Sequence, residues 1–341
     1  MKSTVVLSTD EVRELAADVL TTAGLADDHV QAIADSVTAA ERDGATAHGL
    51  FRLPTYVEGV HSGRVNPHAQ PVLSELKPSV IHVDADEGFA QLALQVGMKD
   101  LTERARGQGI AALAVTRCYS LSALWHEVEQ LARQGLVSLT MTTSKANVAP
   151  AGGHQPLFGT DPMAFGWPRA GGGALVYDQA SSVTARGEIA LRAQRGEEIP
   201  EGWALDPHGN PTTDPAQALA GAQLPFGGYK GASIAMMIEL LAGPMLGEPL
   251  SVESFERDGD RSPLSLRGQL MMAMDPLGFI ADGDRAAQLE HAEKLFSRIL
   301  AQEGTRLPAD RRLEARARSE SEGITLELEQ LERLRALTHR Q

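Results

Sequence analysis

Residues 152–166 read GGHQPLFGTDPMAFG, a glycine-rich polar turn that runs into an apolar stretch. The apolar residues at its end, AFGWP (164–168), are typical of a strand, and LVSLTMTT (136–143) upstream is typical of a buried strand. Turns of this composition, held between buried strands, are where binding sites concentrate. The segment therefore predicts a sheet whose connecting turns carry the functional groups.

The same pattern continues in both directions along the chain. A helix is expected after the strand at 110–116, beginning near residues 120–123, whereas residues 251–265 look polar and loop-like. Further strands are expected at 79–86, 110–116, 173–178 and 268–275, and helices at 91–109, 231–246 and 284–302.

Both ends of the chain look helical. Ser8 and Glu11 have the spacing of a capping box before a helix at 8–23, and a second helix follows Asp27. The second helix is expected to end within ERDGATAHGLFR (41–52), and a further helix is expected at 53–60. The last stretch, 323–337, is amphipathic, so the C-terminal helices are expected to pack against the N-terminal ones.

Composition narrows the class of protein. The 341 residues carry a net charge of −14, which disfavours nucleic acid and anionic membranes as partners. The single cysteine, Cys118, cannot form an internal disulfide, and the N-terminus does not resemble a signal peptide. No stretch approaches the ~20 apolar residues of a membrane span. These features favour a cytoplasmic globular protein.

The common cofactor and catalytic signatures are missing. No G-x-G-x-x-G follows a strand, no Walker loop occurs, and no G-x-S-x-G elbow is found. The histidines show no metal-ligand spacing, so no metal site is expected. What remains is a set of glycine-rich and polar turns at 43–52, 152–166, 177–189, 202–215, 224–231 and 306–312.

Four of these segments resemble a known family in order and spacing. They are HGLFRLPTYV (48–57), PLFGTDPMAFG (156–166), GWALDPHGNPTTDP (202–215) and LPFGGYKG (224–231). Over nearly its whole length the chain resembles the malate/L-lactate dehydrogenase-like oxidoreductases, a nicotinamide-dependent family distinct from the Rossmann dehydrogenases. Within the family, the likeness is greatest to the branch that reduces Δ1-piperideine-2-carboxylate and Δ1-pyrroline-2-carboxylate.

The resemblance implies an α/β, non-Rossmann fold with a mostly antiparallel sheet that binds NADP(H). A helical domain for substrate and dimerisation would combine residues 1–75 with 300–341, and residues 76–299 would form the cofactor domain. The implied assembly is a homodimer. The implied reaction is reduction of a cyclic 2-imino acid, giving L-pipecolate or L-proline.

Two other functions stay open at this stage. One is a 2-oxo-acid dehydrogenase of malate or lactate type that uses NAD(H) or NADP(H). The other is a binding protein without turnover.

His48 and Arg52 are the first candidates for chemistry. A histidine titrates near neutral pH, and the resemblance makes His48 the proton donor; otherwise it caps helix carbonyls. Arg52 lies four residues on, where a guanidinium fork suits a substrate carboxylate. Its alternative role is an ion pair with Glu41 or Glu58.

The resemblance assigns further roles. Glu188 stands where the imine reductases carry an aspartate that works with the histidine; the alternative is a solvated surface acid. Thr160 lies in the turn that contacts the substrate in the family. Its alternative role is to form the turn before Asp-Pro. The cofactor-binding candidates are Ser120, Leu121, Ser122, Ala123, Leu124, Asp178, Gln179, Ala180, Gly228, Lys230, Arg306, Arg311 and Arg312.

Two physical features support the cofactor set. Segment 119–125 would begin a helix, and a helix N-terminus suits phosphate. The three arginines are the best local cation cluster for the extra phosphate of NADP, although such runs are usually solvated.

The chain departs from the family pattern at three positions. Ala47 replaces the family's serine before the histidine, Ser120-Leu121 replaces His-Phe, and Glu188 replaces aspartate. All three changes fall in segments predicted to form the site. They bear on substrate and rate more than on fold.

Overall fold

The computed structural model describes residues 3–259, 262 and 264–338. The chain divides into two compact units. Unit 1 comprises residues 1–139, 165–177 and 272–341, and unit 2 comprises residues 140–164 and 178–271. The predicted division into a substrate domain and a cofactor domain is a functional one and stays a prediction.

Unit 1 begins with three helices where the sequence predicts them. They are α1 (Thr9–Thr22), α2 (Asp27–Arg42) and α3 (Leu53–His61). The capping box is confirmed, because Ser8 Oγ accepts from Glu11 N–H at 3.1 Å and Glu11 Oε2 accepts from Ser8 N–H at 2.7 Å. The buried faces of α1 and α2 pack together.

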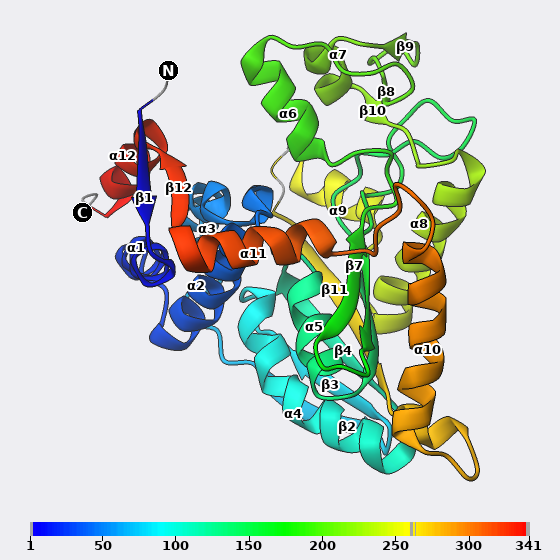
Figure 1. Ribbon diagram of the computed structural model, residues 1–341. Helices are drawn as coiled ribbons and strands as arrows, with labels where there is room; N and C mark the ends of the chain where they lie inside the picture. The colour runs from blue at the N-terminus through cyan, green and yellow to red at the C-terminus, as the bar shows by residue number, and fades with distance from the viewer. Residues whose placement is uncertain (1–2, 260–261, 263, 339–341) are drawn as a thin grey trace. The chain divides into compact units, whose positions relative to one another are not determined.

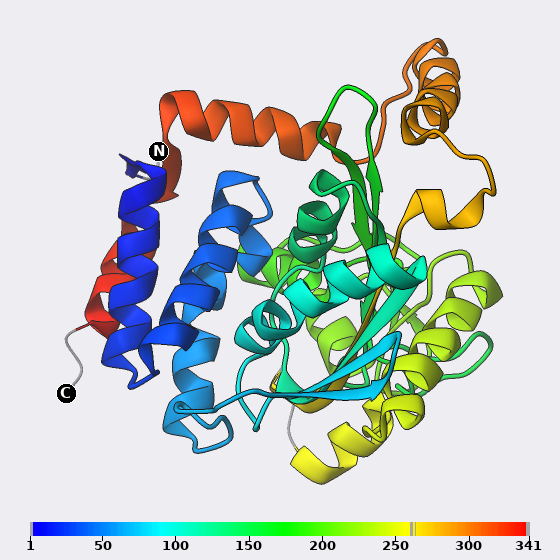
Figure 2. The same ribbon diagram turned by 90° about the horizontal axis from the view of Figure 1, so that it is seen from below.

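The two ends of the chain meet in unit 1, as predicted. Strand β1 (Thr4–Leu7) pairs antiparallel with β12 (Ile324–Glu327). Helix α12 (Leu328–Leu337) buries Leu331 and Leu334 and contacts α1 and α3, while α11 (Asp310–Glu322) contacts α2. In Figures 1 and 2 the blue N-terminal and red C-terminal elements lie side by side.

A seven-stranded sheet follows, in the order β2-β3-β4-β11-β5-β6-β7. Its strands are β2 (Val72–Lys77), β3 (Val80–Asp84), β4 (Ile110–Tyr119), β5 (Val137–Thr142), β6 (Met163–Pro168), β7 (Ala174–Gln179) and β11 (Leu266–Met274). β2 and β3 are antiparallel, whereas β3 and β4 run parallel and are joined by α4 (Ala90–Gln108). The predicted α/β class, with a mostly antiparallel sheet and a helical part from both termini, is confirmed.

Unit 2 carries a smaller sheet of order β10-β8-β9. The strands are β8 (Ala204–Leu205), β9 (Pro211–Thr212) and β10 (Ala222–Gln223), and both pairings are antiparallel. The helices of this unit are α6 (Arg186–Arg195), α7 (Pro215–Ala220), α8 (Tyr229–Ala242) and α9 (Ser251–Asp258). Ile189, Ile199, Ala204 and Ala218 form a buried cluster between α6, α7 and β8.

Three sequence-based expectations were wrong in detail. Strand β4 continues to Tyr119, so α5 (Trp125–Arg133) begins at Trp125 rather than at 120–123. The polar segment 251–265 contains α9, whose N-terminus is capped by Glu253 Oε2 accepting from Leu250 N–H at 2.9 Å. The turn at 306–312 runs into α11. Helix α10 (Arg285–Leu300) forms where predicted.

Among the described helices, none by itself has the length and apolar composition to cross a bilayer. The bent pair 229–246 and 251–258 passes that test of length and composition only when taken together.

Candidate active site

The turn after α2 brings His48 and Arg52 together in unit 1. Two short 3-10 turns, Thr46–His48 and Leu50–Arg52, are joined at Gly49, so the chain does not continue as one α-helix. Arg52 Nε donates to the Ala47 carbonyl at 2.9 Å. His48 Nδ1 lies 3.1 Å from the Leu121 carbonyl oxygen, which joins this turn to the predicted cofactor segment 120–124.

Burial controls the charge of both side chains. Burial, and then the Arg52 cation, lower the pKa of His48 to about 4, against the opposing effect of the hydrogen bond to Leu121. Burial also lowers the pKa of Arg52, opposed by Tyr56, without removing its charge. The turn thus presents a neutral imidazole beside a fixed cation.

Tyr56 and Gln91 form a buried support behind Arg52. Tyr56 lies four residues after Arg52 and is 1% exposed. Gln91 Nε2 donates to the Tyr56 hydroxyl at 2.6 Å, and the Tyr56 and Phe89 rings pack edge to face at 4.7 Å. Burial raises the pKa of the Tyr56 hydroxyl, so it stays protonated. These contacts fix the helix face from which Arg52 projects.

Glu41 lies beneath the turn, a position that the sequence did not single out. The side chain is 4% exposed, and its Oε1 accepts from Leu50 N–H at 2.7 Å. A Cβ at residue 49 would clash with the Glu41 carboxyl, which explains why this position is glycine. Burial raises the pKa of Glu41 to about 7, although the hydrogen bond from Leu50 opposes the rise.

The raised pKa of Glu41 predicts a pH-dependent stability. The folded state binds a proton more tightly than the unfolded state, so stability falls as pH rises from 4.5 to about 7. Glu41→Gln is permanently neutral. We expect its free energy of unfolding to exceed that of the parent by roughly 2–3 kcal/mol at about pH 8 and to match it at about pH 4. Urea unfolding at the two pH values measures the difference.

The exposed Glu58 on α3 provides a matched control, because Glu58→Gln makes the same chemical change at the surface. We expect no pH-dependent gap for this variant. A gap for Glu41→Gln that stays constant with pH would contradict the assignment of a shifted Glu41.

Segment 120–124 is buried but contains an unsatisfied hydroxyl. Its residues are 1% to 9% exposed. Ser122 Oγ is buried and has no hydrogen-bond partner among the described residues. A buried hydroxyl without a partner is costly, so this atom suits a ligand that supplies the missing hydrogen bond.

The predicted arginine cluster is split by the structure. Arg306 and Arg311 are exposed. Arg312 instead stacks on Trp125, with its guanidinium carbon 4.1 Å from the ring centroid, and pairs with Glu129 at 3.7 Å. Arg316, which the sequence did not indicate, binds Asp43 and Glu129. Arg312 therefore has protein partners, whereas Arg306 and Arg311 face solvent.

In unit 2, hydrogen bonds bring three predicted segments together. Ser181 N–H, directly after Ala180, donates to the Thr160 carbonyl at 2.7 Å, and Phe226 N–H donates to the Ser181 carbonyl at 3.0 Å. The turns around Thr160, Ala180 and Gly228 are thus neighbours. Thr160 is held by Ser144, whose Oγ accepts from Thr160 N–H at 2.7 Å.

A buried carboxyl pair underlies this group of turns. Asp161 is fully buried and Glu239 is 4% exposed. Burial, and then the nearby Glu239, raise the pKa of Asp161 well above its usual range. Ser144 N–H and Gly159 N–H donate to Asp161 and Glu239, at 3.1 Å and 3.4 Å. The pair therefore fixes the backbone on both sides of Thr160.

The other predicted site residues of unit 2 are more exposed to solvent. Asp178 and Gln179 are exposed at the end of β7. Glu188 lies in the first turn of α6, is 42% exposed and accepts from Arg192 Nε at 3.1 Å. Gly228 has a φ of 62° before α8, and Lys230 is exposed in the first turn of that helix.

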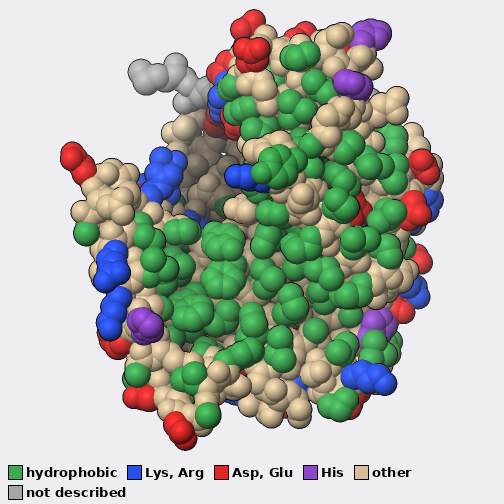
Figure 3. All heavy atoms as spheres, turned by 90° about the vertical axis from the view of Figure 1, so that its right-hand side faces the viewer, with side chains coloured by type: hydrophobic (Ala, Val, Ile, Leu, Met, Phe, Trp, Pro, Cys, Tyr) green, Lys and Arg blue, Asp and Glu red, His purple; other side chains and the backbone are tan. Residues whose placement is uncertain are grey.

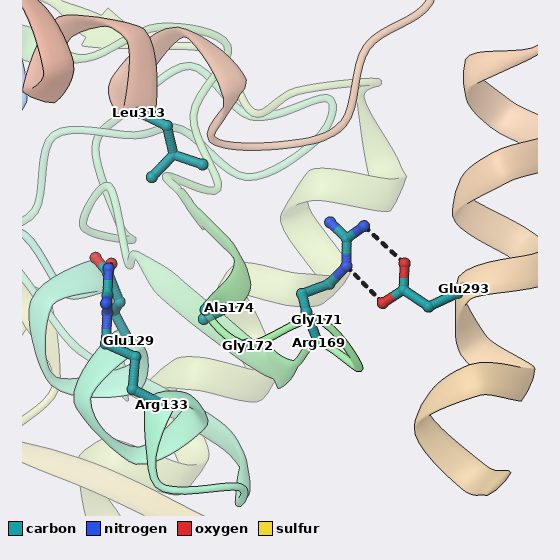
Figure 4. Close-up of a pocket in the computed structure, with 9 residues that line it drawn as sticks. Glu129, Arg133, Arg169, Gly171, Gly172, Ala174, Glu293 and Leu313 are labelled. Atoms are coloured by element: carbon teal, nitrogen blue, oxygen red, sulfur yellow. Dashed lines mark hydrogen bonds and ion pairs between the residues drawn. The ribbon is translucent and has the colours of Figure 1, made fainter. Parts of the chain in front are cut away.

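A separate pocket of about 260 Å³ lies in unit 1 and includes none of the predicted site residues. Figure 4 shows its lining, where Arg169 and Glu293 form two hydrogen bonds of 2.7 Å beside a glycine loop. Arg133 and Glu129 on α5 form a second pair at 2.8 Å. The charged side chains of this lining are therefore paired with one another.

No group of three or more histidine, cysteine, aspartate or glutamate side chains suited to a metal ion occurs within residues 3–259, 262 and 264–338.

Sequence comparison identifies the family. A family profile described as malate/L-lactate dehydrogenase matches residues 7–335. The chain belongs to the malate/L-lactate dehydrogenase family.

Two relatives in this malate/L-lactate dehydrogenase family are similar over almost the full length. Delta(1)-pyrroline-2-carboxylate reductase of Pseudomonas fluorescens is 47% identical, covering 99% of this chain and 100% of the relative. Delta(1)-pyrroline-2-carboxylate/Delta(1)-piperideine-2-carboxylate reductase of Pseudomonas aeruginosa is 47% identical, covering 94% and 95%.

The crystal structure of delta1-piperideine-2-carboxylate reductase from Pseudomonas syringae pv. tomato superposes with a TM-score of 0.91 at 38% identity. The match covers 98% of this chain and 99% of the other. The resemblance read from the four sequence segments is therefore confirmed.

Proposed function

We propose that this chain is an NADPH-dependent reductase of cyclic 2-imino acids, which converts Δ1-piperideine-2-carboxylate to L-pipecolate and Δ1-pyrroline-2-carboxylate to L-proline. Relatives that are 47% identical carry the names of such reductases. The observation that carries the proposal is the turn on which a neutral His48 and a cationic Arg52 lie together. This pairing suits a small acid whose reacting nitrogen is next to a carboxylate.

Arg52 and His48 have different roles in this reaction. The guanidinium of Arg52 binds the substrate carboxylate through its two terminal nitrogens, because its Nε donates to the Ala47 carbonyl. That contact places the adjacent C=N bond near His48, which interacts with the nitrogen. When bound, the nicotinamide cofactor supplies the hydride for the C=N carbon. Thr160 and Glu188 stay predictions for substrate binding and proton transfer.

Several residues fit a bound dinucleotide. Ser122 Oγ needs a hydrogen-bond partner, and the N-terminus of α8 follows two glycines with positive φ. Asp178, Gln179 and Ala180 offer polar groups at the end of β7. Of the arginines, Arg306 and Arg311 are the candidates for the extra phosphate of NADP, because Arg312 is paired with Glu129. Comparing the KM for NADPH with that for NADH tests the preference.

The deciding experiment is cofactor oxidation by purified protein with each of the two cyclic imines, pyruvate and oxaloacetate. Turnover confined to the imines supports the proposal. Turnover of the oxo acids alone would favour a malate- or lactate-type dehydrogenase, and cofactor binding without any turnover would favour a binding protein.

Ala47→Ser tests the family departure next to His48. A serine hydroxyl at this position would add one hydrogen bond, worth about 1 kcal/mol. We expect kcat with the preferred imine to rise by up to about fivefold in the same assay. Turnover in the serine variant alone would mean that the native chain has lost part of its proton relay.

The exposed face of α8 supports a homodimer. Tyr229, Met236, Leu240 and nearby Met245 are 50% to 70% exposed. Figure 3, which looks at the side of Figure 1 where α8 lies, shows hydrophobic side chains gathered on that face. An apolar face of this kind is typical of a subunit interface.

Light scattering tests the homodimer. We expect twice the chain mass for the parent protein and the single chain mass for a Met236→Glu, Leu240→Glu variant. Lys99→Glu on α4, where the lysine side chain is 81% exposed, should stay dimeric. A cytoplasmic location is part of the same proposal and rests on the single cysteine, Cys118, which is buried and cannot form an internal disulfide.

A further inference from the structure

We propose that Ser144 is a positioning residue, which orients Thr160 so that the Thr160 hydroxyl donates a hydrogen bond to a carboxylate oxygen of the substrate. This inference rests on the proposed function and deepens it, because Thr160 is there only a predicted contact for the acid. Ser144 lies two residues after β5, in unit 2 together with Thr160.

The side chain of Ser144 contacts Thr160 twice. Ser144 Oγ accepts from Thr160 N–H at 2.7 Å and lies 3.1 Å from Thr160 Oγ1. Within the described part of the chain, each of the two hydroxyls has the other as its one hydroxyl partner. One hydroxyl proton is therefore used between Ser144 and Thr160, and the other is left for a ligand.

A ligand oxygen decides which proton is left. If Ser144 donates to Thr160 Oγ1, the Thr160 hydroxyl donates to the ligand and every proton has an acceptor. If Thr160 donates to Ser144, the Ser144 proton has no acceptor and the ligand oxygen faces a lone pair. The first arrangement also runs head to tail from Thr160 N–H through both hydroxyls, and such chains of hydrogen bonds strengthen one another. A carboxylate oxygen therefore selects Thr160 as its donor.

A buried carboxyl pair fixes the backbone on which this arrangement depends. Asp161 Oδ1 accepts from Ser144 N–H at 3.1 Å, and Glu239 Oε1 accepts from Gly159 N–H at 3.4 Å. A Cβ at residue 159 would clash with Asp161 Oδ1 and Ser144 Oγ, so this turn packs directly against both side chains. Asp161 has a φ of 36°, a backbone conformation that persists in a non-glycine residue where surrounding contacts enforce it.

The contacts of the pair place its proton on Asp161. Both oxygens of Glu239 accept backbone hydrogen bonds, because Glu239 Oε2 accepts from Ser251 N–H at 3.0 Å. Asp161 Oδ2, in contrast, is buried and receives no hydrogen bond from the residues that the structure describes. A proton on Asp161 Oδ2 that is shared with Glu239 satisfies this atom. Burial and Glu239 raise the pKa of Asp161, which agrees with this placement.

Ser144→Ala tests the positioning role by steady-state kinetics with the preferred imine. We expect KM to rise about fivefold to tenfold while kcat stays within about twofold, because the carboxylate contact exists in the ground state and the transition state alike. Ser254→Ala is the matched control, since it removes a buried hydroxyl from α9 of the same unit, and its KM should equal that of the parent. A parent-like KM for Ser144→Ala would overturn the inference.

A double-mutant cycle with Thr160→Val separates this role from a merely structural one. Valine keeps the shape of threonine but has no hydroxyl. We expect Thr160→Val to raise KM about tenfold or more, the order expected for a lost hydrogen bond to a charged group. In that background Ser144→Ala should change KM by less than about twofold, because no hydroxyl remains to be oriented. Equal effects of Ser144→Ala in the two backgrounds would overturn the inference.

Amide variants test the carboxyl pair. Asp161→Asn keeps an oxygen for Ser144 N–H and supplies an N–H in place of the acid proton, so KM should stay within about twofold of the parent. Glu239→Gln has one oxygen for two backbone N–H groups, so we expect KM to rise about threefold to tenfold. The opposite order of the two variants would overturn the placement of the proton on Asp161.

Failure of the inference is distinguishable from failure of the proposed function. Turnover of the imines by the parent, with an unchanged KM in Ser144→Ala, would overturn the inference alone. Absence of turnover with either imine in the parent would overturn the proposed function itself.

Discussion

Arg316→Leu is expected to lower the free energy of unfolding by about 3–5 kcal/mol, the usual cost of removing one partner from a buried ion pair. Arg316 on α11 donates to Glu129 on α5 through two hydrogen bonds of 2.8 Å and to Asp43 Oδ1 at 2.9 Å. The side chain of Asp43 is 0% exposed and that of Glu129 is 7% exposed. Without Arg316, both carboxylates lose their main partner in a buried setting.

Urea unfolding measures this loss, and its pH dependence identifies the cause. Burial raises the pKa of Glu129, but hydrogen bonds from Arg316 and Arg133 lower it to about 2. The stabilisation is therefore present above 4.5 and is lost as pH falls towards about 2, so the deficit of the variant should shrink over that range. Arg318→Leu, an exposed change on the same helix, is the matched control. Equal losses in the two variants would refute the buried network as the cause.

Arg52→Leu is expected to lower kcat/KM for the preferred imine by about 10²–10³, because a charge-assisted, two-pronged contact to the carboxylate is lost. The loss should fall mainly on KM, since this contact exists in both the ground state and the transition state. Arg52→Lys keeps the charge without the planar fork, and we expect an intermediate value. Steady-state kinetics over a range of imine concentrations separates the two constants.

Arg13→Leu controls for a general effect of removing an arginine. Arg13 forms an ion pair with Asp35 at 2.7 Å between α1 and α2, with both side chains partly exposed. We expect this variant to keep the parent's KM. If Arg52→Leu also kept the parent's KM and kcat, Arg52 would not be the carboxylate-binding residue.

Much of the fold follows from local sequence signals. The Ser8–Glu11 capping box, the apolar periodicity of α1 and α2, and the buried-strand patterns of β4 and β5 each predict an element that the structure contains. Helix α9 was missed because its buried residues include Ser251 and Ser254, whose packing depends on distant partners such as Glu239. Polar residues that are buried by tertiary contacts leave no hydrophobic period in the sequence.

In the candidate site, too, residues that are buried only by tertiary contacts cannot be identified from the sequence. His48 and Arg52 stand out because their residue types and spacing suit the chemistry. Glu41 does not stand out, because a glutamate near a helix end usually faces solvent. Its burial arises only when the chain turns at Gly49 and sets Leu50 N–H on the carboxylate. The unsatisfied Ser122 hydroxyl likewise depends on how residues 120–124 are enclosed.

The pairing of β1 with β12 has a consequence for synthesis of the chain on the ribosome. Residues 4–7 emerge more than three hundred residues before their partner, residues 324–327. Arg316 is also made late. It joins α11 to Asp43, which directly follows α2, and to Glu129 on α5. Translation therefore delivers the turn that carries His48 and Arg52 long before the helix and strand that complete its scaffold. Nascent chains that stall before α11 should carry His48 and Arg52 without an ordered site.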